Sequence, residues 1–274
     1  LVNNVVIKNY KETRFSYKFF EKESIQNSNS IIFPHKYYLD FFKKIYGKNI
    51  FQNIRLYFSD QDQRSKYHYE WIKSIKLKKY SLIDKKIHIA IVVGQVASES
   101  CNRSGDRYVI FDSILKLLGC GYVIHLFVKN VIKSRTDPTI LHESIYHELA
   151  SKNKNFILSF EPMNIGSKIY NKIVRCDYGY LHDDVEKSNI PLFEFQKLNI
   201  PNRYYEYLVT NLYPISLKQK TFSYQNILVK ENGFLLNNIC DLGSVKLDNI
   251  PKNSFYNSFP NVFLKAVSEC SSYN

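Results

Sequence analysis

The stretch that decides the fold reads IHIAIVVGQV (87–96), then SESCNRSGDRY (98–108), VIFDSILKLLG (109–119) and GYVIHLFV (121–128). The apolar run 87–93 is rich in β-branched residues and is bounded by Gly94, which is typical of a strand buried on both faces. Apolar residues then recur at helical spacing up to Gly119, and 122–128 reads as a second buried strand. Strand, loop, helix and strand within about forty residues predict a right-handed, parallel βαβ unit.

Similar elements continue along the chain. We expect a helix over 139–150, a strand over 156–160, a helix over 165–173, a strand over 173–180 and a helix over 204–212. This alternation predicts an α/β protein with a Rossmann-like, mostly parallel sheet. Asn-Gly at 232–233 lies between two apolar runs, so a β-hairpin is expected within 215–240.

The same pattern suggests three regions. Residues 1–80 form a mixed region with strands near 5–7, 31–33 and 54–58 and helices over 37–46 and 68–77, either a first subdomain or the opening strands of the main sheet. Residues 81–214 form the Rossmann-like domain, and 215–274 a partial C-terminal segment, so a second such domain is expected to be incomplete or absent. Because the chain begins with Leu1, we expect it to be a fragment.

Composition narrows the class of protein. A hydrophobic content of 45% with 23% charged residues is that of a folded chain. The net charge of +13 would attract polyanions, but the lysines are scattered, with a local cluster only at IKLKKY (75–80) and IDKK (83–86). Scattered lysines favour a solvated surface and no specific nucleic-acid partner, while the cluster leaves peripheral contact with an anionic membrane as an alternative.

Cysteine usage and hydropathy bear on the compartment. The five cysteines are widely spaced, odd in number and never in a C-x-x-C pair. This spacing argues against a disulfide scaffold and a cysteine zinc site, and it indicates a reducing cytosol. No apolar run has the length of a membrane span. We therefore expect a cytoplasmic protein. The alternative is peripheral association with the inner face of the membrane.

The loop SGDR (104–107) is the first candidate binding element. Gly105 would let the backbone approach a ligand, and free N–H groups at the start of the following helix would favour an anion. The chain has neither a G-x-G-x-x-G fingerprint nor a P-loop. The alternative is that Ser104, Gly105 and Asp106 only turn the chain and cap the helix.

A second candidate, His182-Asp183-Asp184, follows a predicted strand. His182 could act as a general base oriented by Asp183 or Asp184, and the two carboxylates could hold a divalent cation on a diphosphate. The alternative is an exposed loop with helix-capping aspartates. His142 and His147 are five residues apart, off a common helical face, so they predict no zinc site.

Two segments resemble GT-B-fold glycosyltransferases. IHIAIVVG followed by SGDRYVIFDSILKLLGCGYVIHLFV (104–128) is similar to the opening βαβ unit of that family, and FPNVFLKAVS (259–268) is similar to its donor-site segment. Residues that match the first motif are Gly105, Asp106, Arg107, Gly121 and Val123, and residues that match the second are Phe259, Pro260, Asn261, Leu264 and Ala266. The family's two donor-binding glutamates fall on Asn257 and Lys265.

The resemblance implies transfer of a sugar from a nucleotide-sugar to a glycan, lipid-linked or protein acceptor, without a resident cofactor. Gly105, Asp106 and Arg107 would line the cleft, Asn261 would lie at the donor, and His182 with Asp183 would supply the base. Lys218 and Lys220 could neutralise the diphosphate. Without the two glutamates, a truncated or inactive member is also expected.

Two other functions remain open from the residues themselves. One is a basic, non-catalytic α/β module that binds anionic lipid or nucleic acid. The other is a metal-dependent transferase that uses His182-Asp183-Asp184 as its metal site.

Overall fold

The computed structural model describes residues 20–33, 35–58, 66–96, 110–131, 145–160, 166–181, 198, 202–218 and 223–244. The chain divides into two compact units, one of residues 1–63 with 254–274 and one of residues 64–253. Within the described part of the chain, no helix has both the length and the apolarity to cross a membrane.

The first unit contains a small sheet of its own. Strands β1 (Ser30–Phe33) and β2 (Arg55–Phe58) pair in parallel, joined through helix α2 (Lys36–Tyr46) and the 3-10 turn η1 (Lys48–Phe51). A further helix covers 20–26. Phe33, Leu39 and Phe51 are buried between these elements. Among the described residues β1 and β2 pair only with each other, so they are not the opening strands of the main sheet.

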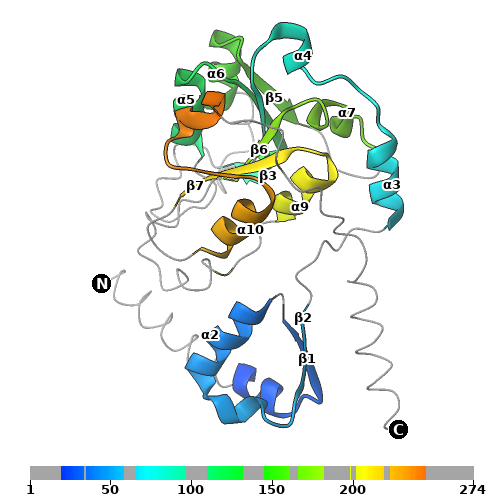
Figure 1. The fold of residues 1–274 in the computed structure, drawn as a ribbon, viewed down its shortest axis with the longest axis vertical. Coiled ribbons are helices and arrows are strands. Elements are labelled where there is room, and N and C mark those ends of the chain that lie inside the picture. The colour runs from blue at the N-terminus through cyan, green and yellow to red at the C-terminus, as the bar shows by residue number, and fades with distance from the viewer. Residues whose placement is uncertain are drawn as a thin grey trace. The chain divides into compact units, whose positions relative to one another are not determined.

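The second unit is built on a six-stranded parallel sheet in the order β5-β4-β3-β6-β7-β8 (Figure 1). The strands are β3 (His88–Val96), β4 (Val123–Val131), β5 (Phe156–Phe160), β6 (Tyr178–Tyr180), β7 (Tyr213–Leu217) and β8 (Phe234–Leu236). The predicted βαβ unit is confirmed, because β3 pairs in parallel with β4 from His88↔Val123 to Val96↔Val131. The Rossmann-like α/β fold follows from this topology.

Helices cover both faces of this sheet. Helices α5 (Phe111–Gly119) and α6 (Ile145–Lys152) and the 3-10 helix η4 (Ile239–Ser244) share one core with the first face. Helices α9 (Asn202–Val209) and α10 (Tyr224–Asn232) pack on the opposite face, and α3 (Lys66–Ser74), α4 (Ser81–Asp84) and α7 (Ile169–Ile173) complete the described helices. Consecutive residues Ile89, Ala90 and Ile91 are therefore fully buried, as the run 87–93 predicts.

The β-hairpin expected within 215–240 is wrong. Residues 224–232 form helix α10, and β8 pairs in parallel with β7, with Ile215 opposite Phe234. A parallel pair needs a crossover, which the helix supplies. The apolar run ILV (227–229) is too short to separate strand from helix by periodicity. Gly233 instead lets β8 pass against the backbone of Pro214, where a Cβ would overlap the Pro214 carbonyl.

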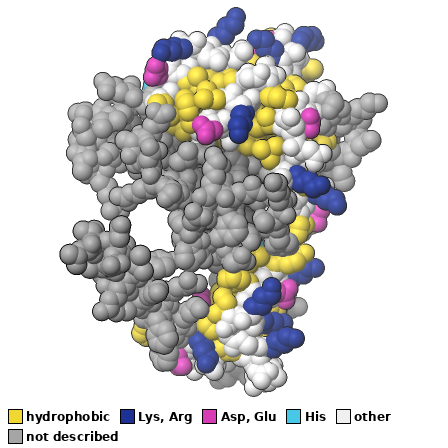
Figure 2. Space-filling model, turned by 90° about the vertical axis from the view of Figure 1, so that its left-hand side faces the viewer, with side chains coloured by type: hydrophobic (Ala, Val, Ile, Leu, Met, Phe, Trp, Pro, Cys, Tyr) yellow, Lys and Arg dark blue, Asp and Glu magenta, His cyan; other side chains and the backbone are white. Residues whose placement is uncertain are grey.

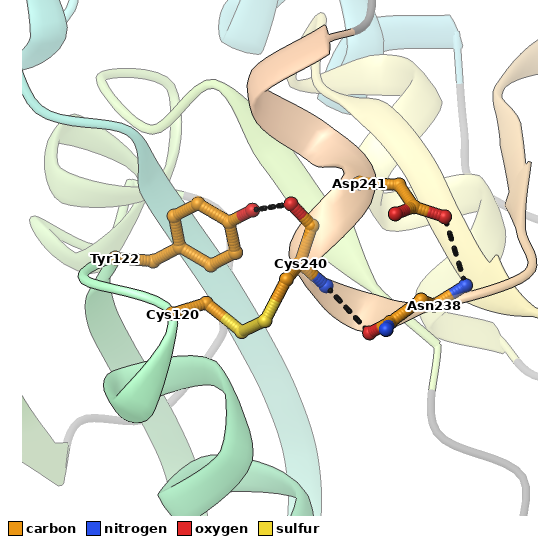
Figure 3. Close-up of a disulfide and its surroundings, with 5 residues drawn as sticks. All are labelled: Cys120, Tyr122, Asn238, Cys240 and Asp241. Atoms are coloured by element: carbon orange, nitrogen blue, oxygen red, sulfur yellow. Dashed lines mark hydrogen bonds between the residues drawn. A yellow bond between two sulfur atoms is a disulfide. The ribbon is translucent and has the colours of Figure 1, made fainter.

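Cysteine spacing argues against a disulfide scaffold, but the structure contains a disulfide. Cys120, at the end of α5, is bonded to Cys240 in η4 (Figure 3). The Tyr122 hydroxyl donates to the Cys240 carbonyl at 2.9 Å, and the Cys240 N–H donates to Asn238 Oδ1 at 3.1 Å. The partners are 120 residues apart, so only the fold brings them together. With this disulfide present, the spacing of the cysteines does not support the inference of a reducing cytosol.

Candidate functional site at the carboxyl edge of the sheet

The order of the strands reverses between β3 and β6. From β3 the chain adds β4 and β5 on one side, and then returns to place β6, β7 and β8 on the other. Helices α5 and α9, which follow β3 and β6 in the chain, therefore cover opposite faces of the sheet. In parallel α/β sheets this switch point is where ligands bind.

Tyr207 of α9 fixes the two strands at the switch point. The ladder between β3 and β6 consists of Ile89↔Tyr178 and Ala90↔Gly179. Just beyond it, the Tyr207 hydroxyl accepts a hydrogen bond from the Val92 N–H at 3.0 Å and donates one to the Tyr180 carbonyl at 3.0 Å. Burial raises the pKa of Tyr207, so the hydroxyl stays protonated. The phenol thus takes the place of the next ladder hydrogen bonds and sets the spacing of the strand ends.

Gln225, in the first turn of α10, fixes the ends of β6 and β7. Its amide Nε2 donates to the Leu181 carbonyl at 3.3 Å and to Ser216 Oγ at 3.1 Å, and Gln225 and Ser216 are buried. The next residue, Asn226, is 9% exposed, and its Oδ1 has no hydrogen-bond partner in the part of the molecule that the structure describes. The first turn of α10 therefore brings buried amide groups to this edge.

The predicted site residues follow strands that end at this edge. The loop with Gly105, Asp106 and Arg107 comes after β3, His182 and Asp183 come after β6, and Lys218 and Lys220 come after β7. Lys218 is exposed, and its backbone N–H donates to the Leu236 carbonyl at 2.8 Å. The residues that lie outside the described part of the chain are Gly105, Asp106, Arg107, His182, Asp183, Asp184, Lys220, Asn257, Asn261 and Lys265.

Sequence reasoning missed a polar cluster at the opposite, amino edge of the sheet. His88 Nε2 donates to the Asp84 carboxylate at 3.0 Å, and His88 Nδ1 lies 2.8 Å from His125 Nε2. Both imidazoles are buried, and the Tyr80 ring stacks on each of them with centroids 5.0 Å apart. A histidine inside each of the apolar runs IHIAIVV and VIHLFV was the available signal.

A second acid joins this cluster to the loop before β3. Asp177 accepts from the His88 N–H at 2.9 Å and from Ser81 Oγ at 2.5 Å. Arg175 lies over the Tyr80 ring, 4.0 Å from its centroid. Among the described residues, no group of three or more His, Cys, Asp or Glu is placed to hold a metal ion. Because these groups satisfy one another, the cluster fastens residues 79–88 to the sheet.

Acidification is expected to destabilise the protein through His125. Burial, and then the neighbouring His88, lower the pKa of His125 from 6.5 to about 3. Between these values the unfolded chain binds a proton that the folded protein does not, so stability falls as pH falls through this window. The expected loss is about 1.4 kcal/mol per pH unit, or about 2 kcal/mol between pH 6.5 and 5. Urea unfolding at several pH values measures it.

The charged groups near His125 determine which variants are needed to test this pH dependence. Asp84 favours protonated His125, whereas Arg175 and Lys172 oppose it. The backbone N–H of Lys86 lowers the pKa of Asp84. The Asp84 carboxylate is therefore protonated, and its contribution to stability lost, only at a lower pH. His125→Gln should flatten the dependence between pH 6.5 and 5, whereas His147→Gln on α6 should leave it intact. An unchanged slope in His125→Gln would assign the acid sensitivity to other groups.

Basic residues are spread over the described surface of one face of the molecule (Figure 2). On the face shown in Figure 2, Lys and Arg side chains lie apart over the described surface and do not gather in one groove. This agrees with the scattered lysines of the sequence, and it gives no support on that face to a continuous polyanion groove.

No protein-family model matches the chain, and no curated protein matches its sequence. A crystal structure of a GtfA/B complex is similar over 92% of this chain, with 9% sequence identity and a TM-score of 0.41. The aligned region spans 40% of the chain in that complex. Likeness at this level carries no inference about function, so the case for function depends on the sheet and its edges.

Proposed function

We propose that the carboxyl edge of the six-stranded sheet binds a nucleotide-sugar and that the protein transfers the sugar to a glycan, lipid-linked or protein acceptor. The observation that carries this proposal is the reversal of strand order between β3 and β6, where the Tyr207 hydroxyl joins the two strand ends. Such switch points in parallel sheets accept nucleotides. The sequence resemblance to GT-B glycosyltransferases supports the same ligand class.

The proposed roles follow the connections of β3, β6 and β7. Gly105, Asp106 and Arg107 would contact the substrate from the loop after β3. His182, oriented by Asp183, would remove a proton from the acceptor hydroxyl as the bond from the sugar to the diphosphate breaks. The acceptor oxygen then bonds to the anomeric carbon, and the nucleoside diphosphate leaves with the bonding electron pair.

Lys218, Lys220 and Asn261 are the proposed donor contacts. Lysine side chains after β7 would neutralise the diphosphate as the leaving group gains charge. Asn257 and Lys265 stand where the resemblance would place two donor-binding carboxylates, so the lysines and Asn261 would have to hold the donor without them. A divalent cation on Asp183 and Asp184 would take over part of the charge neutralisation.

Isothermal titration calorimetry with UDP-, GDP- and ADP-sugars tests the proposal. We expect saturable heat with one nucleotide class, and about tenfold weaker binding in the double variant Lys218→Gln/Lys220→Gln because two charge-assisted contacts are lost. Lys230→Gln is the matched control. Lys230 is an exposed lysine in the last turn of α10, at the opposite end of the helix from Gln225.

Turnover is measured separately as release of nucleoside diphosphate. His182→Ala should keep the heat of donor binding and lose the release. Absence of heat with all three donor classes, with and without manganese, would contradict the proposal. Equal weakening by the Lys230→Gln control would show that the heat reports non-specific charge attraction.

A further inference from the structure

Helix α4 presents its apolar residues to solvent. Leu82 is 64% exposed and Ile83 is 61% exposed, and Leu77, five residues before Leu82, is 47% exposed. None of the four residues of α4 is buried. Isolated exposed apolar side chains are ordinary on protein surfaces. Two consecutive ones on a single helical turn, with a third close by in the chain, form a local apolar tip.

The opposite side of α4 is polar and is attached to the sheet. Ser81 Oγ donates to Asp177 Oδ1 at 2.5 Å, and the Asp84 carboxylate accepts from His88 Nε2 at 3.0 Å. Immediately before the helix, the Tyr80 ring stacks on the His88 and His125 imidazoles. A surface helix normally turns its apolar side to the core and its polar side to water. Here the arrangement is inverted, and the contacts of Ser81 and Asp84 hold it in place.

Exposed lysines flank the apolar tip in the chain. Lys76, Lys78, Lys85 and Lys86 are exposed within the segment 76–86. The one acid of this segment, Asp84, accepts hydrogen bonds from His88 and from the Lys86 backbone N–H at 3.0 Å. The segment therefore exposes four lysines that lie close in the chain to two large exposed apolar side chains. Figure 1 shows α4 at the periphery of its unit, away from β7 and α10.

This combination matches the interface of an anionic bilayer. Apolar side chains enter the boundary between headgroups and acyl chains, and lysines at the same level meet lipid phosphates. Nucleic acid would neutralise the lysines but would leave Leu82 and Ile83 in water, so it accounts for only half of the surface. We propose that the segment 76–86, with Leu82 and Ile83 at its tip, docks this protein on membranes that contain anionic lipid. The proposal is independent of any nucleotide-sugar.

Vesicle flotation tests the proposal with the full chain. Binding to phosphatidylcholine vesicles that contain phosphatidylserine is expected, with little binding to phosphatidylcholine alone. Leu82→Ser/Ile83→Ser should weaken binding about tenfold or more, and Lys78→Gln/Lys85→Gln by about fivefold per lysine. All four side chains are exposed, so these variants should keep the fold. The matched control is Leu115→Ser/Lys116→Gln on α5, where Leu115 is 43% exposed and Lys116 is also exposed.

Tryptophan fluorescence reports insertion directly. The chain has a single tryptophan, so the signal of an Ile83→Trp variant is obtained by subtracting that of the wild type. A blue shift with anionic vesicles is expected for Ile83→Trp and none for Leu115→Trp. The proposal is overturned if both serine and control variants bind vesicles like the wild type. It is also overturned if the lysine variants lose binding to DNA or RNA oligonucleotides while vesicle binding stays unchanged.

Discussion

Reduction of the Cys120–Cys240 disulfide is expected to lower the free energy of unfolding by about 4 kcal/mol. The bond joins residues separated by 120 positions, so it closes a loop that spans most of the second unit. In the chain-entropy account, a loop of this length restricts the unfolded chain by about 5 kcal/mol, and native disulfides typically deliver somewhat less. Urea unfolding with and without dithiothreitol, at fixed pH, measures the difference.

The local structure indicates what reduction leaves in place. Tyr122 would still donate to the Cys240 carbonyl, and Ile239 and Leu242 of η4 are buried in the same core as Ile114 and Leu117 of α5. We therefore expect the reduced protein to keep its sheet while η4 becomes the least stable part of the unit. The main cost of reduction comes from the greater freedom of the unfolded chain, because the folded contacts survive.

The double variant Cys120→Ser/Cys240→Ser separates the disulfide from other effects of reductant. It should unfold at the midpoint of the reduced wild type and be insensitive to dithiothreitol. Cys176 is an internal marker, because burial raises the pKa of its thiol and should protect it from alkylation in the folded state. The assignment fails if Cys120 and Cys240 are alkylated in the native, unreduced protein and reductant does not move the midpoint.

The buried strands could be predicted from the sequence because their pattern is local. The run at Ile89–Val93 has too many consecutive apolar residues for an exposed strand, and the structure buries all of them. The hairpin could not be rejected in the same way. The role of Gly233 depends on a close contact with the backbone of Pro214, which lies 19 positions earlier in the chain. That contact exists only once β7 and β8 are parallel neighbours.

The polar features were harder to predict because each depends on pairing between distant residues. His88 and His125 approach each other through the register of β3 and β4, in which Ala90 lies opposite His125. The sequence showed two histidines in apolar runs, but not that Asp84 and Tyr80 would complete their surroundings. Similarly, the candidate loops could be assigned to strand ends, whereas the strand order that brings those ends to one edge came from the fold.

The two ends of the sheet therefore differ in their chemistry. At the carboxyl edge, the side chains of Tyr207 and Gln225 donate hydrogen bonds to backbone carbonyls. These bonds fix the strands that precede the candidate loops. At the amino edge, polar groups hold α4 with its apolar tip outward. A ligand at the first edge and a membrane at the second would not compete for the same residues.

Replacing Gly179 with alanine is expected to lower the free energy of unfolding by about 3 to 4 kcal/mol, which combines overpacking with lost hydrogen bonds. Gly179 lies in the central strand β6, and the Tyr207 ring packs directly on its Cα, so a Cβ would overlap the ring. The ring has little freedom to withdraw. It is fully buried, and its hydroxyl holds the Val92 N–H and the Tyr180 carbonyl.

Two variants of Tyr207 test whether its ring causes the cost of Gly179→Ala. Tyr207→Phe keeps the ring and removes the hydroxyl, which should cost about 1 to 3 kcal/mol because the Val92 N–H loses its partner. Gly179→Ala should remain costly in that background, since the steric overlap persists. In a Tyr207→Ala background the same methyl enters the space left by the ring, so its cost should fall below about 1 kcal/mol, a coupling that a double-mutant cycle detects.

Gly119→Ala is the matched control for the loss of a glycine. A Cβ at Gly119 would meet no atom within 4 Å, so this change should be neutral or slightly stabilising. Urea unfolding of all six variants, single and double, gives the comparison. If Gly179→Ala is as mild as Gly119→Ala, then β6 and α9 can separate without loss. The Tyr207 hydroxyl would then not be what sets the spacing of the strand ends at the proposed nucleotide-sugar site.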